Sequence, residues 1–338
     1  MAIRIAFVGF RHGHIFSLYD LVKETPGVEL AGACEEDAAT RRELARSQKA
    51  AITHDRFDEM LDRAPCDAVA IGDYYVRRGS LAIRALERGK HIICDKPLAT
   101  TVEEVEAIER LAKLKGLKVG LMLDLRDLAP FIGLRNLVRG GALGEIHAVS
   151  FGGQHPLMLG SRPAWYFEPG KHGGTINDIG IHAFDCIPWI TGLEFKTVQA
   201  ARAWNAFAKD FPHFKDSAQM MLTMNNGCGV LGDVSYHLPE GIGYGAPVYW
   251  RTTIFGRGGY AEVCAHSKEI TLAVAGEKEL RFEPLPPAAP GKYFQSFLRD
   301  LRGEAQGDDL CTRSVLRASR LAVEVQRAAD SGSYNVPL

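Results

Sequence analysis

The sequence lacks a surplus of charge and any long apolar segment. Its 338 residues carry 40 Lys and Arg against 41 Asp and Glu, which gives a net charge of −1. A balanced chain argues against a nucleic-acid or membrane partner held by charge alone. The longest apolar runs have only the length of a strand, so we expect no membrane span. The start, MAIRIAFVG, lacks the charged region, the long apolar core and the cleavage site of a signal peptide.

A C-x-x-C motif is also missing. The seven cysteines are odd in number and scattered along the chain. Most of them lie in apolar, strand-like surroundings such as HIICDKP and LAGACEED. We therefore expect reduced and mostly buried thiols in a cytoplasmic protein.

The first third of the chain alternates strand and helix patterns. Apolar runs at 3–9, 28–34, 68–73, 91–95 and 118–123 alternate with helical patterns at 14–24, 38–48, 77–89 and 101–115. Strands that are apolar throughout and separated by helices indicate a parallel sheet covered on both faces. We predict an α/β Rossmann dinucleotide-binding domain over residues 1–123.

The pattern changes after about residue 124. Strand-like runs joined by turns such as Asn226-Gly227 and Gly258-Gly259 predict antiparallel pairing. Residues 124–338 are therefore predicted to form an α+β domain with a large, mostly antiparallel open sheet. Two closing helices, near 293–302 and 313–331, are able to pack back on the first domain.

The dinucleotide fingerprint after the first strand is incomplete. G-x-G-x-x-G would place glycine or alanine at 9, 11 and 14, whereas GFRHGH has Gly9, Arg11 and His14. Arg11 takes the space that the second glycine leaves for the pyrophosphate, but its cation could swing aside and pair with a phosphate. Gly13 would serve if the turn is shifted by one or two residues. His12 and His14 form an H-x-H without a Cys or Asp partner nearby in the turn, so we expect phosphate or substrate neighbours and no metal site.

Three other stretches form a specific combination. GKHIICDKPLATTVEEVEAI matches a G-K-H-V-x-x-E-K-P pattern, with Asp95 where Glu is usual. LVRGGALGEIHAVSF follows at 137–151, and GGTINDIGIHAFDCIPWITG at 173–192 matches G-G-x-x-x-D-x-G-x-H-x-x-D. Together they resemble the Gfo/Idh/MocA family of nicotinamide-dependent sugar oxidoreductases, and the resemblance covers essentially the whole chain. It implies hydride transfer between NAD, or alternatively NADP, and a sugar, cyclitol or related polyol.

The resemblance also implies catalytic roles. Lys96 follows the fourth strand at the carboxyl end of a parallel sheet, where ligands bind, although taken alone it is better explained as a solvated lysine that heads a helix. Asp178 and His182 lie four residues apart and would share one helix face, either for catalysis or as a buried structural contact. By resemblance His182 is the acid/base, Asp178 orients the substrate and Lys96 stabilises the developing alkoxide. The resemblance further implies a cis bond before Pro97.

The cofactor-binding candidates lie at the strand ends. Glu35 and Glu36 end the second strand, where an acidic residue binds the ribose 2′-OH and favours NAD, although such residues also suit a helix start. After the third strand, DYYVRR stands where the family usually has T-P-N-x-x-H. The candidates are Gly9, Arg11, His12, Gly13, Glu35, Asp73, Tyr74, Asp95 and Pro97.

The second domain is expected to supply the substrate contacts. Trp165 and Tyr166 could stack on a sugar ring, and Arg126, His155 and His172 are further candidates. The resemblance implies a homodimer or homotetramer formed through the open sheet. Two other functions stay open: an NAD-assisted sugar hydrolase or lyase of the same family, and a non-catalytic ligand-sensing protein with a degenerate cofactor site.

Overall fold

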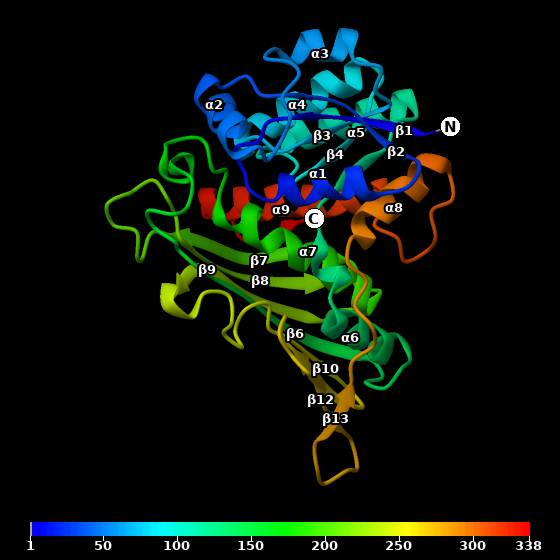
Figure 1. The fold of residues 1–338 in the computed structure, drawn as a ribbon. Coiled ribbons are helices and arrows are strands. Elements are labelled where there is room, and N and C mark those ends of the chain that lie inside the picture. The colour runs from blue at the N-terminus through cyan, green and yellow to red at the C-terminus, as the bar shows by residue number, and fades with distance from the viewer. Residues whose placement is uncertain (1) are drawn as a thin grey trace. The chain divides into compact units, whose positions relative to one another are not determined.

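The computed structural model describes residues 2–338, and the chain forms two compact units (Figure 1). Unit 1 comprises Met1–Met122, Gly170–Gly173 and Tyr293–Ser319. Unit 2 comprises Leu123–Pro169, Gly174–Lys292 and Arg320–Leu338.

The described part of unit 1 contains a five-stranded parallel sheet, as the sequence predicts. Its strands are mostly apolar, and the central strand β3 is completely buried, because helices cover both faces. The order places β1 next to β3 where the direction of strand addition reverses, and open α/β sheets bind ligands at that point. The order is β2 (Val28–Cys34), β1 (Ile3–Val8), β3 (Ala68–Ile71), β4 (His91–Cys94) and β5 (Val119–Leu121).

The helices of unit 1 begin and end where the chain supplies caps. The Asp37 carboxylate accepts the Thr40 N–H at the start of α2, and Gly116 ends α5 in the left-handed conformation. Helix α3 was not predicted, because its seven residues are too few to show a clear period. The helices are α1 (Ile15–Glu24), α2 (Ala38–Ser47), α3 (Phe57–Arg63), α4 (Tyr75–Glu87), α5 (Val102–Lys115) and α8 (Lys292–Arg302), with α9 (Thr312–Ser331) divided between the units.

The described part of unit 2 contains a nine-stranded sheet. All of its strand pairs are antiparallel except β6 with β9. The mostly antiparallel open sheet of the prediction is thus confirmed, while the short edge strands β13 and β14 were missed. The order is β13 (Arg281–Pro284), β12 (Glu269–Val274), β11 (Gly259–Val263), β10 (Thr252–Gly256), β6 (Ile146–Pro156), β9 (Gly229–Leu238), β8 (Ser217–Met224), β7 (Phe195–Trp204) and β14 (Val336–Pro337).

Unit 2 also contains the helices α6 and α7 and several short helical turns. Helix α7 (Ile181–Thr191) is buried along almost its whole length, and α6 (Ala129–Arg139) packs against it. A π-helical turn, η3 (Ile176–Gly180), leads directly into α7. Three short 3₁₀ turns complete the unit: η1 (Asp124–Asp127), η2 (Ala164–Phe167) and η4 (Glu240–Ile242).

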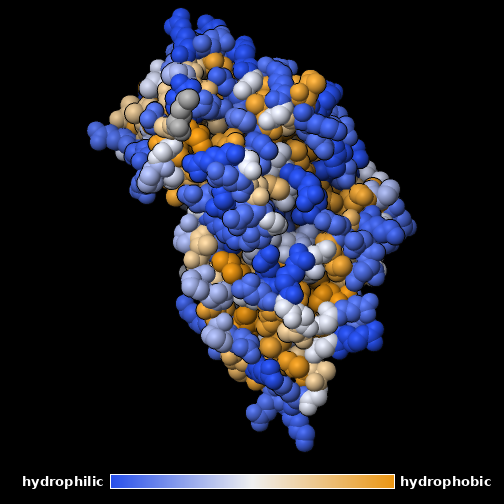
Figure 2. Space-filling view, turned by 90° about the vertical axis from the view of Figure 1, so that its right-hand side faces the viewer, coloured by the Kyte–Doolittle hydropathy of each residue, from blue (hydrophilic) through white to orange (hydrophobic). Residues whose placement is uncertain are grey.

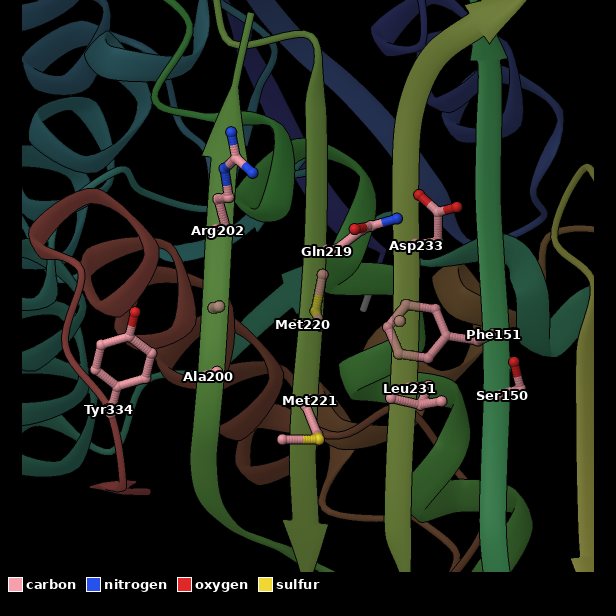
Figure 3. Close-up of a pocket in the computed structure, with 12 residues that line it drawn as sticks. Ser150, Phe151, Ala200, Arg202, Gln219, Met220, Met221, Leu231, Asp233 and Tyr334 are labelled. Atoms are coloured by element: carbon pink, nitrogen blue, oxygen red, sulfur yellow. The ribbon is translucent and has the colours of Figure 1, made fainter. Parts of the chain in front are cut away.

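One face of the unit 2 sheet carries exposed apolar side chains. Met221 on β8 is 49% exposed and Leu231 on β9 is 59% exposed, as alternation along the strands requires. Figure 3 shows both side chains on this face, with Ala200 on the neighbouring strand β7 (Phe195–Trp204). Figure 2 shows hydrophobic surface gathered where unit 2 lies.

Two further expectations concern cysteines and membranes. All seven cysteines lie within residues 2–338 and are free; five are buried and two are partly exposed, which confirms the predicted thiols. Over the same residues no helix combines the length and apolarity that a membrane crossing requires.

Candidate active site

The turn after β1 has a glycine where the backbone demands one. Gly9 has a φ of +77°, and a Cβ at this position would lie 2.6 Å from the Asp73 Cβ. At Gly13, by contrast, a Cβ would meet no described atom within 4 Å. The first fingerprint glycine is therefore required by its surroundings, and open space adjoins Gly13.

Helix α1 begins next to that space. The His14 side chain makes no capping hydrogen bond within the described chain, and the first turn holds no acidic residue. The N-terminus of a ten-residue helix carries partial positive charge and favours an anion. Together with Gly9, this start of α1 fits the pyrophosphate of a dinucleotide.

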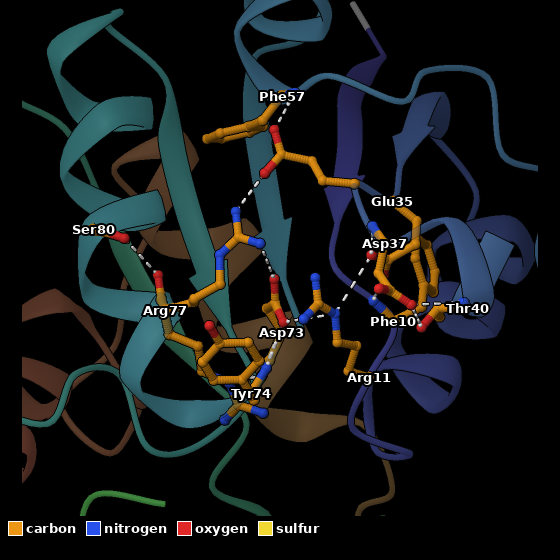
Figure 4. Close-up of polar contacts among 12 residues, drawn as sticks. Phe10, Arg11, Glu35, Asp37, Thr40, Phe57, Asp73, Tyr74, Arg77 and Ser80 are labelled. Atoms are coloured by element: carbon orange, nitrogen blue, oxygen red, sulfur yellow. Dashed lines mark hydrogen bonds and ion pairs between the residues drawn. The ribbon is translucent and has the colours of Figure 1, made fainter. Parts of the chain in front are cut away.

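Two arginines and three carboxylates form a network across the ends of β2 and β3 (Figure 4). The Arg11 Nε lies 3.3 Å from the Asp73 Oδ1 and 3.6 Å from the Glu35 Oε1. Arg77 pairs with Glu36, and its Nη1 lies 3.5 Å from the Asp73 Oδ2. The Arg11 guanidinium therefore points at carboxylates that the sequence assigns to cofactor binding.

Glu35 also holds the backbone of the turn. Its carboxylate accepts the Phe10 N–H at 2.7 Å and the Asp37 N–H at 2.8 Å. Burial raises the pKa of Glu35, while these two hydrogen bonds and Arg11 lower it. Burial likewise raises the pKa of Asp73 against the pull of Arg11. The Glu35 carboxylate, which the sequence predicts as a ribose ligand, is thus engaged by the backbone of the turn itself.

A second polar cluster lies at the end of β4. The His12 Nδ1 contacts the Asp95 Oδ2, and the His14 Nδ1 lies 3.4 Å from the Asp95 Oδ1. Arg78 donates to the same carboxylate at 3.0 Å, and the Tyr75 hydroxyl lies 3.3 Å from the His12 Nε2. Burial lowers the pKa of His12 to about 4 in spite of Asp95. Burial would raise the pKa of Asp95, but His12 and Arg78 hold it well below its usual range.

Arg78 also shapes the segment around Lys96. It is completely buried, and it donates to the Asp73 carbonyl at 2.6 Å, to the Asp95 carbonyl at 2.8 Å and to the Lys96 carbonyl. The bond between Lys96 and Pro97 is cis, as the resemblance implies. Lys96 itself is buried. Arg78 was not predicted as a site residue, although it lies in the unusual DYYVRR stretch.

Tyr74 and His172 complete the surroundings in unit 1. The guanidinium of Arg11 and the ammonium of Lys171 each lie 5.1 Å from the centre of the Tyr74 ring. The His172 ring lies 5.4 Å from that of Tyr75.

In unit 2, Asp178 lies on η3 and His182 in the first turn of α7, and both are buried. π-Helical turns are frequent at functional sites. Gly174 precedes them with a φ of +99°, and a Cβ there would lie 2.2 Å from Gln326. The Gln326 Oε1 accepts the Ile176 N–H at 2.9 Å. The glycine pair of the motif thus lets α9 anchor the start of η3.

Residues from distant strands and turns surround this pair. The Tyr236 hydroxyl, from β9, donates to the Asp178 carboxylate. The His182 Nδ1 lies 3.8 Å from the Asp124 Oδ1, and its ring lies 4.8 Å from that of Trp250. Burial first, and then Asp178, raise the pKa of Tyr236 well above its usual value. Sequence reasoning missed Tyr236 and Trp250, because no motif marks them.

The predicted substrate residues fall into two groups. His155 lies among aromatic rings, with its ring 5.1 Å from Trp250 and 6.2 Å from Tyr236. Trp165 and Tyr166 are buried and stack on each other with ring centres 4.2 Å apart. Arg162 was not predicted, yet its guanidinium lies 4.6 Å from the Tyr166 ring centre and 5.1 Å from that of Tyr236.

Arg126 has a structural partner. Its guanidinium is buried and donates to both carboxylate oxygens of Asp185, at 2.8 and 2.5 Å. It also lies 5.3 Å from the Trp189 ring centre. This pair ties η1 to α7.

Comparisons with known proteins agree with the geometry. Residues 3–122 match the family described as "Oxidoreductase family, NAD-binding Rossmann fold", and residues 131–262 match the "GFO/IDH/MocA C-terminal domain". The chain is 26% identical to the rhizopine catabolism protein MocA of Rhizobium meliloti over 239 residues, 71% of each chain. It is 28% identical to an inositol 2-dehydrogenase of an Arthrobacter species over 246 residues, 72% of this chain and 69% of the relative. A solved oxidoreductase of Thermotoga maritima superposes with a TM-score of 0.85 at 26% identity, covering 99% of this chain and 100% of that one.

Proposed function

The chain belongs to the Gfo/Idh/MocA oxidoreductases, and on that premise we propose that it transfers hydride between NAD and a sugar, cyclitol or related polyol. The observation that carries this proposal is the arrangement of Asp178 and His182 in unit 2. Both side chains are buried, Asp178 is oriented by the Tyr236 hydroxyl, and His182 lies beside the Trp250 ring. The named activity of the inositol 2-dehydrogenase relative supports the substrate class.

We assign the proton chemistry to His182 and Lys96. In the oxidative direction a substrate C–H bond breaks as hydride leaves, and His182 takes the proton of the adjacent hydroxyl. Lys96 stabilises the negative charge that develops on that oxygen, and Asp178 orients the substrate hydroxyls. NAD, when bound, would accept the hydride.

The cofactor would be held by the turn that follows β1. Gly9 and Gly13 leave room at the start of α1 for the pyrophosphate, and Arg11 would exchange its carboxylate partners for a phosphate. Glu35, at the end of β2, favours NAD over NADP because a carboxylate repels a 2′-phosphate. Tyr74, Asp95 and Pro97 lie at the ends of the neighbouring strands.

The polyol would meet an aromatic and basic lining in unit 2. His155 and Trp250 lie near His182, and Arg162 adds a cation beside Tyr166. Aromatic faces suit the apolar side of a sugar or cyclitol ring.

We also propose that the chain assembles as a homodimer or homotetramer through the open sheet face. Its exposed Met221 and Leu231 are apolar and adjoin Phe151 in a hollow of about 470 Å³. A second copy would cover this apolar surface. Light scattering should give a mass of two or four chains, and Leu231→Glu should lower it. A monomeric wild-type chain would contradict this assembly.

The function is tested by cofactor binding followed by a substrate screen. Purified protein is titrated with NADH and with NADPH by nicotinamide fluorescence, and a panel of polyols is then followed at 340 nm, the absorbance of the reduced cofactor. We expect micromolar affinity for NADH, weaker binding of NADPH, and net reduction of NAD with a polyol. Binding of neither cofactor would contradict the proposal and favour the sensor. Turnover without net NAD reduction would favour the hydrolase or lyase.

A further inference from the structure

His12, His14 and Asp95 bring three metal-binding side chains together in unit 1. Each offers one ligand atom, and these atoms all lie within 4.8 Å of one another. We propose that they bind a divalent transition-metal ion with the preferences of zinc. None of its ligands is assigned to the proton chemistry proposed above, while His12 and Asp95 are also predicted cofactor neighbours.

The donor set and its spacing suit such an ion. Imidazole nitrogens and carboxylate oxygens are zinc ligands with bonds of about 2.0–2.2 Å, so two ligands of a tetrahedral ion lie about 3.3–3.5 Å apart. The His14 Nδ1 and the Asp95 Oδ1 are separated by 3.4 Å. The ring centres of His12 and His14 are 4.4 Å apart. Small side-chain rotations would therefore place all three ligands around one ion.

One oxygen of the Asp95 carboxylate accepts no hydrogen bond from the residues described and has only the His14 Nδ1 near it, at 3.4 Å. Asp95 is completely buried, and this oxygen is its Oδ1. Its Oδ2, in contrast, receives the Arg78 guanidinium and contacts the His12 ring. Buried carboxylate oxygens are rarely left unsatisfied, and a bound cation would complete the coordination of Oδ1.

Neighbouring groups orient the ligands as they do at known metal centres. A metal-bound histidine usually makes a hydrogen bond through its other ring nitrogen, and the Tyr75 hydroxyl lies 3.3 Å from the His12 Nε2. Arg78 fixes the Asp95 carboxylate in the same manner. The His14 side chain is 58% exposed, which gives an ion access from solvent. Three protein ligands leave a fourth position for water or for an oxygen atom of a ligand.

The proposed metal site differs from the sequence prediction that His12 and His14 do not bind a metal. The sequence offered two histidines and no acidic partner in the turn, whereas the fold brings Asp95 to them from the end of β4. Arg11, which stands between the two Gly residues of the turn, faces Glu35 and Asp73 instead. Within one turn, Arg11 therefore contacts carboxylates that follow β2 and β3, whereas the two histidines contact the carboxylate that follows β4.

The test measures metal binding to the full chain without cofactor. Protein freed of any affinity tag is stripped with EDTA and dialysed, and Co²⁺ is titrated while the visible absorption of tetrahedral Co²⁺ is recorded. Zn²⁺ is then added as a competitor. We expect one Co²⁺ per chain, displaced by Zn²⁺, and a fall in affinity of at least about tenfold in His14→Ala and in Asp95→Asn. Tyr75→Phe should weaken binding by about tenfold or less, because it removes only the partner of a ligand.

The matched control is His147→Ala, which removes an exposed histidine on β6 and should leave Co²⁺ binding unchanged. Thermal unfolding verifies that His14→Ala, altered at an exposed site, keeps its fold. No saturable Co²⁺ binding, or equal binding by wild type and His14→Ala, would overturn the proposal and leave the cluster as an ion-pair network. NADH binding is measured separately in EDTA, so failure of the metal site and failure of the dehydrogenase are distinguishable.

Discussion

The turn after β1 in unit 1 and the η3 turn in unit 2 hold their carboxylates by different means. At the turn after β1, charges are paired with charges: Arg11 lies between Glu35 and Asp73. On η3, a neutral hydroxyl holds the carboxylate, since Tyr236 donates to Asp178. The first region is therefore open to rearrangement when an anion competes for Arg11, whereas the second is fixed before any ligand arrives.

The two regions also differ in how they keep their motifs. In unit 2 the motif residues Asp178 and His182 are unchanged, and their partners come from elsewhere in the chain. In unit 1 the turn departs from the G-x-G-x-x-G fingerprint, with arginine at position 11, but Gly9 still adopts the positive φ that the turn needs. The turn can thus lose the second glycine of the fingerprint and keep the backbone conformation that Gly9 provides.

The largest effect is expected from the proton chemistry. His182→Ala and Lys96→Ala should each lower kcat for the polyol found in the screen by at least about 100-fold, because a general acid/base or a charge-stabilising group is lost. The affinity for NADH should stay nearly unchanged. His147→Ala and Lys278→Ala, both at exposed positions, serve as controls. Wild-type rates in either catalytic variant would refute its assignment.

The sequence could predict the features that depend on local patterns, and it could not predict contacts between distant segments. Periodicity and strand-length apolar runs were enough for the sheet of unit 1 and for the antiparallel character of unit 2, because both follow from local patterns. Asp178 and His182 lie in one motif and were found together. Tyr236 and Trp250 were missed because contacts across long sequence separations bring Tyr236 to Asp178 and Trp250 to His182, and the same holds for Asp95 beside His12. Contacts of this kind join segments that are far apart in the sequence, and periodicity describes only local structure.

The next largest effect concerns the backbone of the turn. Gly9→Ala forces a residue with a Cβ to a φ of +77° and to within 2.6 Å of Asp73. We expect it to lower the free energy of unfolding by at least about 2 kcal/mol and to abolish detectable NADH binding. Gly13→Ala, where a Cβ meets open space, is the matched control and should change stability by less than about 0.5 kcal/mol. Equal melting curves for the two variants would show that the turn is not constrained at Gly9.

Arg11 tests whether the charged turn can serve a cofactor. Arg11→Ala should weaken NADH binding by about tenfold, because a phosphate loses a charge-assisted hydrogen bond. The salt dependence of NADH binding should become shallower as well, since one cation fewer is involved. Arg46→Ala, an exposed arginine on α2, is the control. Tighter binding by Arg11→Ala would mean that the arginine obstructs the site.

The smallest effect should come from the neutral contact in unit 2. Tyr236→Phe removes the hydroxyl that orients Asp178, and we expect kcat/KM to fall by about threefold to tenfold, as for the loss of one hydrogen bond. Burial and Asp178 hold the pKa of Tyr236 well above its usual value, so the phenol stays protonated and the hydrogen bond persists below that pKa. The reduction should therefore be uniform across neutral and mildly alkaline pH. Tyr260→Phe on β11 is the control. If kcat/KM of the wild type fell at alkaline pH and Tyr236→Phe removed that fall, Tyr236 would titrate in this range. The Asp178 site would then not be held by a neutral contact.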